Sequence, residues 1–221
     1  MYGDLPQPPP EETPPVSRPR LFDNEKALDA AIACFWRRGF EATSVRDLAV
    51  EMGINGPSLY NAFGDKRTLF MQALERYAKG SMRERIERIE REHQPKAALR
   101  IFFRDLVERS LSDPQHLGCL IVNTALELAP HDAEIRALIA SYFEEIESFF
   151  RRCLGRALAA GELAPPIRPA DSARSLLGVM LGLRVAARVK PEQALLEGMV
   201  RASLAFLNYE QPSSSRNQGD A

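Results

Sequence analysis

Apolar residues recur at helical spacing along most of the chain. The first clear case is a stripe at positions i, i+4, i+7 and i+8, formed by Leu28, Ile32, Phe35 and Trp36. Asp23 or Asn24 can cap this helix. Gly39 follows two arginines and predicts the end of this helix, because glycine is the preferred residue just after a last helical turn. No run of alternating apolar and polar residues predicts a strand. The pattern therefore predicts an all-α fold.

Two short helices are predicted next. Thr43 or Ser44 can cap the first of them, and Gly53 ends it. Asn55 can cap the second, with Pro57 in its first turn, where a missing N–H costs nothing. Leu59 and Phe63 of this second helix are expected to point inward.

A longer fourth helix is expected to start after Asp65 and to kink near Gly80. Prolines then separate five further helices, which are predicted at about 96–111, 117–129, 132–160, 169–188 and 191–208. The sequence therefore predicts about nine helices.

The composition of successive segments divides the chain into parts with different roles. Residues 1–17 and 210–221 are rich in proline or in small polar residues, and we expect both to be disordered. Between them we expect a three-helix unit at 18–66, a connecting helix at 66–93 and a larger helical bundle at 94–209.

Charge and composition are those of an ordinary soluble protein. The formal net charge is −1 and 45% of the residues are hydrophobic, so an anionic partner must be met by a local basic patch. The apolar runs are too short to span a bilayer, and the N-terminal residues do not read as a secretory signal. Three cysteines, at positions 34, 119 and 153, do not suggest a disulfide framework. We therefore expect a cytoplasmic protein without a membrane partner.

The two short helices joined by a glycine turn predict a helix-turn-helix. In that motif the second helix enters the major groove of DNA and the first steadies it across the backbone. On spacing alone, an ordinary three-helix bundle is an equally good reading.

The stretch from Leu21 to Tyr77 resembles the DNA-binding domain of TetR-type (TetR/AcrR) transcriptional regulators. The resemblance rests on five consecutive motifs, namely Arg-Gly-Phe, Thr-Ser-Val-x-x-Leu-Ala, Gly-Ile, Ser-Leu-Tyr-x-x-Phe and Asp-Lys-x-x-Leu-Phe. It implies a homodimeric regulator, in most cases a repressor, that a small-molecule effector releases from a palindromic operator. No cofactor is implied.

The resemblance also assigns DNA contacts to individual positions. Those in the helix-turn-helix are Thr43, Ser44, Arg46, Pro57, Ser58, Tyr60, Asn61 and Lys66. Tyr60 and Lys66 match residues that bind phosphate, and Arg46 matches a position that reaches a base edge or a phosphate.

One position departs from the pattern of the family. Many members carry Lys or Arg where this chain has Gly56, and the unit holds nearly as many acidic as basic residues. We therefore expect one subunit to bind DNA weakly. Arg18 and Arg20 resemble a short arm that could lie in the minor groove, although a solvated linker fits them nearly as well.

The resemblance implies that the last two helices form the dimer interface, and their wide apolar arc supports this independently. An effector pocket is expected among the preceding helices, although core packing is the plainer reading of each residue. The candidates are Phe102, Phe103, Leu106, Cys119, Asn123, Tyr142, Phe143, Phe149 and Met180.

Two alternatives remain at this level. Cys119 lies near a predicted helix N-terminus, where the helix dipole can activate a thiol, so the protein could be a thiol-based sensor. A helical interaction module without DNA binding is the other. An enzyme is disfavoured, because the histidines show no metal-ligand spacing and no nucleophile or phosphate-loop motif is found. We thus predict no catalytic and no metal-binding residues.

Overall fold

The computed structural model describes residues 23–163 and 166–208. Within these ranges the chain is helical and contains no strand, which confirms the predicted fold class. The helices are α1 (Asn24–Arg38), α2 (Val45–Met52), α3 (Gly56–Phe63), α4 (Lys66–Ala78), the π-helical η1 (Lys79–Arg83), α5 (Glu84–Glu92), α6 (Pro95–Leu111), α7 (Leu120–Glu127), α8 (Ala133–Ala159), α9 (Pro169–Val189), α10 (Gln193–Ser203) and the 3-10 turn η2 (Ala205–Asn208).

Some predictions fall outside the described residues. These are the disordered segments at 1–17 and 210–221 and the arm residues Arg18 and Arg20. They therefore remain predictions. None of the helices within the described ranges is long and apolar enough to cross a membrane.

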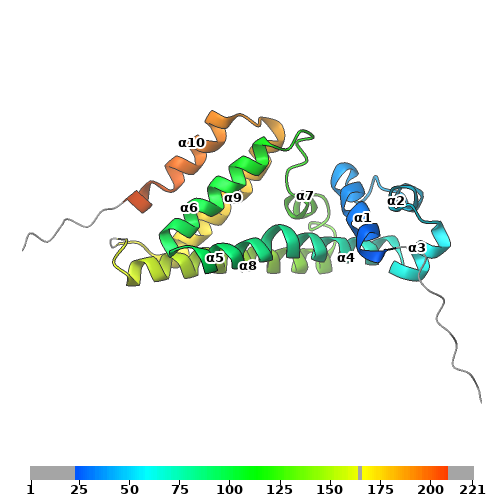
Figure 1. The fold of residues 1–221 in the computed structure, drawn as a ribbon, viewed down its shortest axis with the longest axis horizontal. Helices are drawn as coiled ribbons and strands as arrows, with labels where there is room; N and C mark the ends of the chain where they lie inside the picture. The colour runs from blue at the N-terminus through cyan, green and yellow to red at the C-terminus, as the bar shows by residue number, and fades with distance from the viewer. Residues whose placement is uncertain (1–22, 164–165, 209–221) are drawn as a thin grey trace, which may run out of the picture.

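The helices form an elongated molecule with a small unit at one end (Figure 1). Helices α1, α2 and α3 make up this unit. The run α4–η1–α5 leads from it along the molecule beside α8. Helices α6, α9 and α10 complete the bundle at the far end, and α7 lies between that bundle and α1. The shape therefore places α7 where it can contact both parts.

The helices of the small unit start at the predicted caps. The side chain of Asp23 accepts hydrogen bonds from the backbone of Glu25 and Lys26, and that of Asn55 accepts one from Ser58 at 2.8 Å. Ser44, not Thr43, caps α2 in a capping box with Asp47. These side chains satisfy backbone N–H groups that would otherwise have no partner at the helix N-termini.

Two helices differ at their ends from the prediction. The helix expected from about residue 117 begins at Leu120, because His116 and Gly118 have positive φ angles and Cys119 is extended. The last predicted helix is divided into α10 and η2 after Ser203.

The irregularity expected near Gly80 is a π-helical turn, η1. Gly80 is exposed, whereas Met82 of the same turn is buried. π-Helical turns insert one extra residue into a helix and are frequent at functional sites.

Two aromatic clusters form the centres of the two parts. Where α4 packs against the small unit, the ring centroids of Phe35 and Phe70 are 4.8 Å apart, as are those of Phe40 and Phe70. In the bundle, four phenylalanines contact one another, namely Phe102, Phe103, Phe149 and Phe150. Both clusters belong to one continuous hydrophobic core that extends from the small unit into the bundle.

Candidate DNA-binding surface and effector cavity

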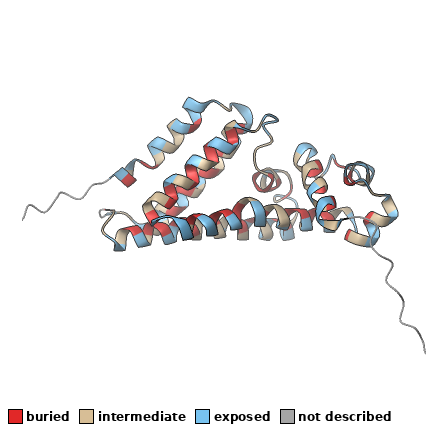
Figure 2. Ribbon diagram, in the orientation of Figure 1, coloured by how far each residue is buried: buried red, intermediate tan, exposed pale blue. Residues whose placement is uncertain are grey.

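Helices α2 and α3 are anchored by their inner faces. Leu48 of α2 and Leu59 of α3 are fully buried, and Phe63 is nearly so. Gly53 joins the helices in the left-handed conformation, with a φ of 66°, which glycine adopts without strain. The outer residues of α2 and α3 are exposed or intermediate (Figure 2). This geometry is that of a helix-turn-helix.

The outer face of α3 carries the side chains that the sequence assigned to DNA. Tyr60 is 52% exposed, and Pro57 and Asn61 are exposed as well, whereas Ser58 is half-buried. A large apolar ring exposed to this extent beside an exposed amide contributes little to the core. The structure therefore brings Tyr60 and Asn61 together on one solvent-facing surface.

Thr43 has a structural role in this unit. Its side chain is buried, and its hydroxyl donates a hydrogen bond to the carbonyl oxygen of Gly39 at 2.6 Å. The hydroxyl therefore closes the turn between α1 and α2, and the phosphate contact from Thr43 stays a prediction. Ser44 remains exposed at the start of α2.

The basic side chains of this surface fall into two groups. Arg37 and Arg38 form ion pairs, with Glu51 at 2.6 Å and with Asp47 at 2.7 Å. Hydrogen bonds from Ser44 and the charge of Arg38 lower the pKa of the Asp47 carboxyl. These pairs leave little net positive charge from the two arginines.

Arg46 and Lys66 form the second group. Arg46 is exposed on α2. Lys66 begins α4, and its ammonium lies 4.2 Å from the centre of the Phe40 ring and 3.5 Å from the carbonyl oxygen of Glu41. The helix N-terminus adds partial positive charge at the same place, which suits phosphate binding.

Gly56 gives a prediction of its own. A Cβ atom built at Gly56 has no neighbour within 4 Å, and the residue has no positive φ angle. Gly56→Lys should therefore be accommodated, and in a dimer it should steepen the slope of log affinity against log salt concentration by about 2. Fluorescence anisotropy with labelled DNA at several salt concentrations measures this slope. Gly56→Gln is the neutral control, and an equal slope in the two variants would contradict a phosphate-facing position.

Hydrogen bonds and ion pairs that the sequence did not reveal join the small unit and α4 to α7 and α8. The Glu127 carboxylate, at the end of α7, accepts hydrogen bonds from the backbone N–H groups of Phe40 and Glu41 at 3.2 and 3.0 Å. Arg67 of α4 contacts Asp132 through two nitrogen atoms and pairs with Glu134. The end of α7 and the start of α8 are therefore in direct contact with the turn after α1 and with α4.

A small cavity lies where α4, η1, α5, α6, α7, α8 and α9 meet. Its volume is about 40 Å³, which leaves room for a few water molecules. Of the predicted effector residues, Phe102, Leu106, Cys119, Phe143 and Met180 line it.

The other predicted effector residues belong elsewhere. Phe103 and Phe149 are fully buried in the aromatic cluster of the bundle. Tyr142 is also fully buried, and its hydroxyl donates to Glu75 at 2.9 Å. The Asn123 amide, for which the sequence required a partner or a ligand, donates to the Leu117 carbonyl at 2.9 Å. None of these four residues lines the cavity. Each is instead packed in the core or hydrogen-bonded to another part of the protein.

Sequence reasoning missed four polar residues of the cavity wall, namely Tyr77, Ser81, Arg85 and Arg184. A signal for them is visible afterwards in the helical spacing. Arg85 falls three residues after Met82 and four before Ile89, and both of these are buried. A charged residue on an apolar stripe is either paired or functional.

Tyr77 connects the cavity to the DNA-binding unit. Its hydroxyl lies 3.7 Å from the Cys119 sulfur, and burial, followed by the charge of Cys119, raises the pKa of the phenol. Its ring packs edge-on against Trp36 of α1, with 5.1 Å between the ring centroids. The indole N–H of Trp36 donates to the Leu117 carbonyl at 3.2 Å. The cavity wall and α1 are thus joined by direct contacts.

Comparison with known proteins agrees with this arrangement. The profile described as "Bacterial regulatory proteins, tetR family" matches residues 27–73. The profile described as "Tetracyclin repressor-like, C-terminal domain" matches residues 95–203. The two matched segments fall on the helix-turn-helix unit and on the bundle.

Individual relatives share most of the chain. The HTH-type transcriptional regulator YezE of Bacillus subtilis is 34% identical over 195 residues, which is 87% of this chain and 100% of YezE. The HTH-type transcriptional repressor ComR of Escherichia coli is 30% identical, over 83% of this chain and 87% of its own length.

A solved structure is similar as well. A cysteine mutant of the TetR family transcriptional regulator CifR, complexed with 26 bp operator DNA, aligns with a TM-score of 0.76 and 32% identity. The alignment covers 86% of this chain and 98% of the CifR chain. A helical interaction module without DNA binding is thereby set aside. The chain belongs to the TetR family of bacterial regulatory proteins and is a helix-turn-helix transcriptional regulator that binds DNA.

Proposed function

We propose that this protein is a repressor that binds a near-palindromic operator as a homodimer and leaves it when a small molecule enters the cavity. The main observation behind the proposal is the solvent-facing side of α3, which carries Tyr60 and Asn61. On the opposite side, Leu59 and Phe63 are buried and hold the helix against the core. The relative ComR is named as a repressor, and CifR was solved on operator DNA.

The dimer interface is assigned to α9 and α10. Only Leu196 of α10 is buried in one chain, and exposed and intermediate residues extend along most of this helix (Figure 2). Leu195 of α10 and Val185 of α9 are large exposed apolar residues, and Gly178 leaves open space for a close approach. A second copy related by a two-fold axis would cover this face. It would also place two recognition helices one DNA turn apart, roughly 34 Å.

The cavity is the proposed effector site because α7 joins it to the DNA-binding unit. Cys119, which caps the start of α7, lines the cavity, and Glu127 at the other end of α7 holds the turn between α1 and α2. A ligand too large for the present cavity displaces its wall and so favours a second arrangement of α7. Differential affinity for the two arrangements is what shifts the population away from the DNA-bound state.

The proposal assigns no catalytic role to the chain. The comparisons reported above are with transcriptional regulators. A regulator of this kind acts where the bacterial chromosome lies, so we place the protein in the cytoplasm.

Operator binding is tested with DNA from upstream of the protein's own coding sequence. We expect two subunits per site, protection of a near-palindromic segment in footprinting, and affinity that falls steeply with salt concentration. Binding that is insensitive to salt, or equal for an unrelated sequence of the same length, would contradict the proposal.

A second candidate is regulation by reaction of Cys119. The observation that favours it is that this thiol lines the cavity beside the Tyr77 hydroxyl, whereas Cys34 and Cys153 are buried in the core. Burial is also the main reason that the pKa of Cys34 is raised, and it raises the pKa of Cys153 to about 12, which leaves these two thiols unreactive.

Alkylation provides the test of this candidate. We expect iodoacetamide to release DNA from the wild type but not from Cys119→Ser, with the number of modified thiols counted by mass spectrometry. The Cys34→Ser variant is the control and should behave as the wild type does. Release of DNA from Cys119→Ser at the same rate rules the candidate out.

A further inference from the structure

Arg85 is the most unusual residue of the cavity wall. It is 5% exposed, so its guanidinium is almost completely removed from water. Its Nη2 donates to the carbonyl oxygen of Phe102 at 2.5 Å, and the guanidinium lies over the Phe102 ring, 4.6 Å from its centre. Its Nε is buried and has no hydrogen-bond partner among the described residues. A buried cation with an unsatisfied donor is costly unless something else satisfies it.

The carboxylate beside Arg85 neutralises it only in part. The Oδ2 atom of Asp105 lies 3.8 Å from Nε, beyond hydrogen-bond distance, and Asp105 is shared with Arg104 at 3.6 Å. Burial and the nearby charge of Arg109 lower the pKa of Arg85 to about 10, so the guanidinium is still charged at neutral pH.

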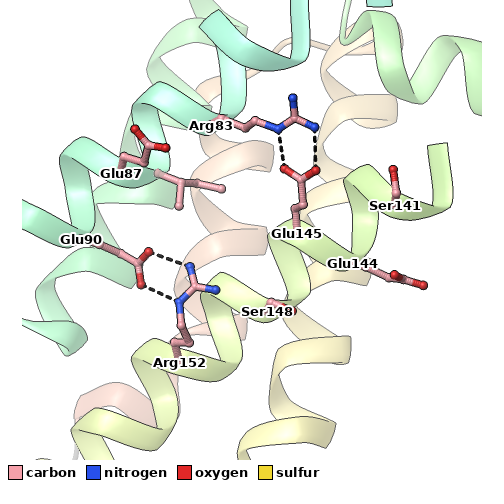
Figure 3. A pocket seen from close by; sticks show the side chains of 9 residues that line it. Arg83, Glu87, Glu90, Ser141, Glu144, Glu145, Ser148 and Arg152 are labelled. Carbon is pink, nitrogen blue, oxygen red and sulfur yellow. Dashed lines mark hydrogen bonds and ion pairs between the residues drawn. The ribbon is translucent and has the colours of Figure 1, made fainter. Parts of the chain in front are cut away.

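Two arginines in the neighbouring groove form two-point pairs with carboxylates, which sets Arg85 apart. In the groove between α5 and α8, Arg83 binds both oxygens of Glu145 at 2.8 and 2.7 Å (Figure 3). Arg152 binds both oxygens of Glu90 at 3.0 and 2.6 Å in the same groove (Figure 3). Such two-point pairs are the favoured geometry of arginine with a carboxylate. The chain thus provides carboxylates to its other inter-helix arginines here, but provides none in this geometry to Arg85.

A second arginine faces the same cavity. Arg184 of α9 lines it and donates a single hydrogen bond, at 3.3 Å, to the hydroxyl of Ser110. Among the described residues, the cavity wall contains these two cations and no carboxylate, and most of the remaining lining residues are apolar, including Phe102, Ile146 and Met180. The wall therefore combines positive charge with apolar surface.

We propose that the effector is a small organic acid whose carboxylate binds Arg85 and Arg184 and whose apolar part contacts Phe102 and Met180. The inference rests on the proposed function only in calling this molecule the effector, since the binding site itself is defined by the cavity. A carboxylate supplies the acceptors that the buried guanidinium lacks, in the planar geometry that arginine prefers. An acid larger than the present cavity must also push its wall outward, and α7 with Cys119 is part of that wall.

Calorimetric titration of the full-length protein without DNA tests the site directly. The probes are phenylacetate and hexanoate, with phenylacetamide as the neutral analogue and acetate as the acid without a large apolar part. We expect at least one of the two larger acids to bind about tenfold or more tightly than both phenylacetamide and acetate. Equal binding of phenylacetamide overturns the role of the charge, and equal binding of acetate overturns the role of the apolar wall. Absence of binding by both larger acids at millimolar concentration overturns the proposal.

Variants locate the bound acid. Arg184→Gln, at a half-buried position, is expected to fold and to weaken binding about tenfold, and Arg85→Lys should weaken it similarly while keeping the charge. Arg174→Gln, exposed on the same helix as Arg184, is the matched control and should bind as the wild type does. Circular dichroism establishes folding for each variant. Unchanged affinity in folded Arg184→Gln and Arg85→Lys overturns the assignment.

Failure of the proposed acid site and failure of the proposed repressor function give different experimental results. DNA binding is measured in the absence of acids, so a protein that binds the acid but not an operator refutes the repressor and leaves the site intact. A protein that binds its operator but none of the acids refutes the site and leaves the repressor intact. Release of the operator by phenylacetate or hexanoate, lost in Arg184→Gln, supports both.

Discussion

The double variant Tyr60→Ala, Lys66→Ala is expected to lose nearly all affinity for operator DNA. Tyr60 is half exposed on the outer face of α3, and Lys66 extends from the N-terminus of α4 beside it in the DNA-binding unit. Each is proposed to bind one phosphate per subunit, which makes four contacts in a dimer. At about 1 kcal/mol for each contact, the loss is about 4 kcal/mol, or close to a thousandfold. The salt slope should also become shallower by about 2, since two lysine contacts are removed.

Fluorescence anisotropy with labelled operator DNA measures both quantities. The matched control is Lys79→Ala, because Lys79 is an exposed lysine at η1, away from the helix-turn-helix. Tyr60→Phe isolates the hydroxyl and should lose about thirtyfold, because one hydrogen bond per subunit, or about 2 kcal/mol in a dimer, is removed. A double variant that is folded and binds as tightly as Lys79→Ala would contradict these phosphate assignments.

Gly39→Ala is expected to destabilise the protein by about 3 kcal/mol, even though it adds only one methyl group. Gly39 has a φ of 80° and a ψ of 172°, a region of backbone conformation that is open almost only to glycine. An added Cβ atom would lie 2.9 Å from both carboxylate oxygens of Glu127. The substitution therefore strains the backbone and also displaces the carboxylate that accepts hydrogen bonds from Phe40 and Glu41.

Urea unfolding monitored by circular dichroism measures this change. Gly53→Ala is the control, because Gly53 has a positive φ of 66° but open space around its Cβ position, and it should cost only about 1 kcal/mol. In a Glu127→Ala background, Gly39→Ala should cost less, because the clash with the carboxylate is gone. Equal effects of Gly39→Ala in both backgrounds would show that Glu127 takes no part in holding this turn.

The sequence by itself determined the helices and most of the outward-facing residues of α3. Helix caps and helix ends depend on neighbours only a few residues away, so Asp23, Ser44 and Asn55 were visible as cap candidates before any tertiary contact was known. The helical period separated Leu59 and Phe63 from Tyr60 for the same reason, since it sorts positions by face alone. Family motifs then assigned a chemical role to the exposed face.

Only the tertiary structure decided which polar side chains find hydrogen-bond partners within the protein and which do not. Thr43 and Asn123 read as candidates in the sequence, but partners at Gly39 and Leu117 account for them. Arg85 and Arg184 were not among the candidates from the sequence, yet the packing of α5 and α9 brings them to one cavity. Glu127 and Phe40 are far apart in sequence and meet because α7 lies against the turn after α1. A side chain's partners depend on which helices pack together, and the spacing of residues along one helix does not contain that information.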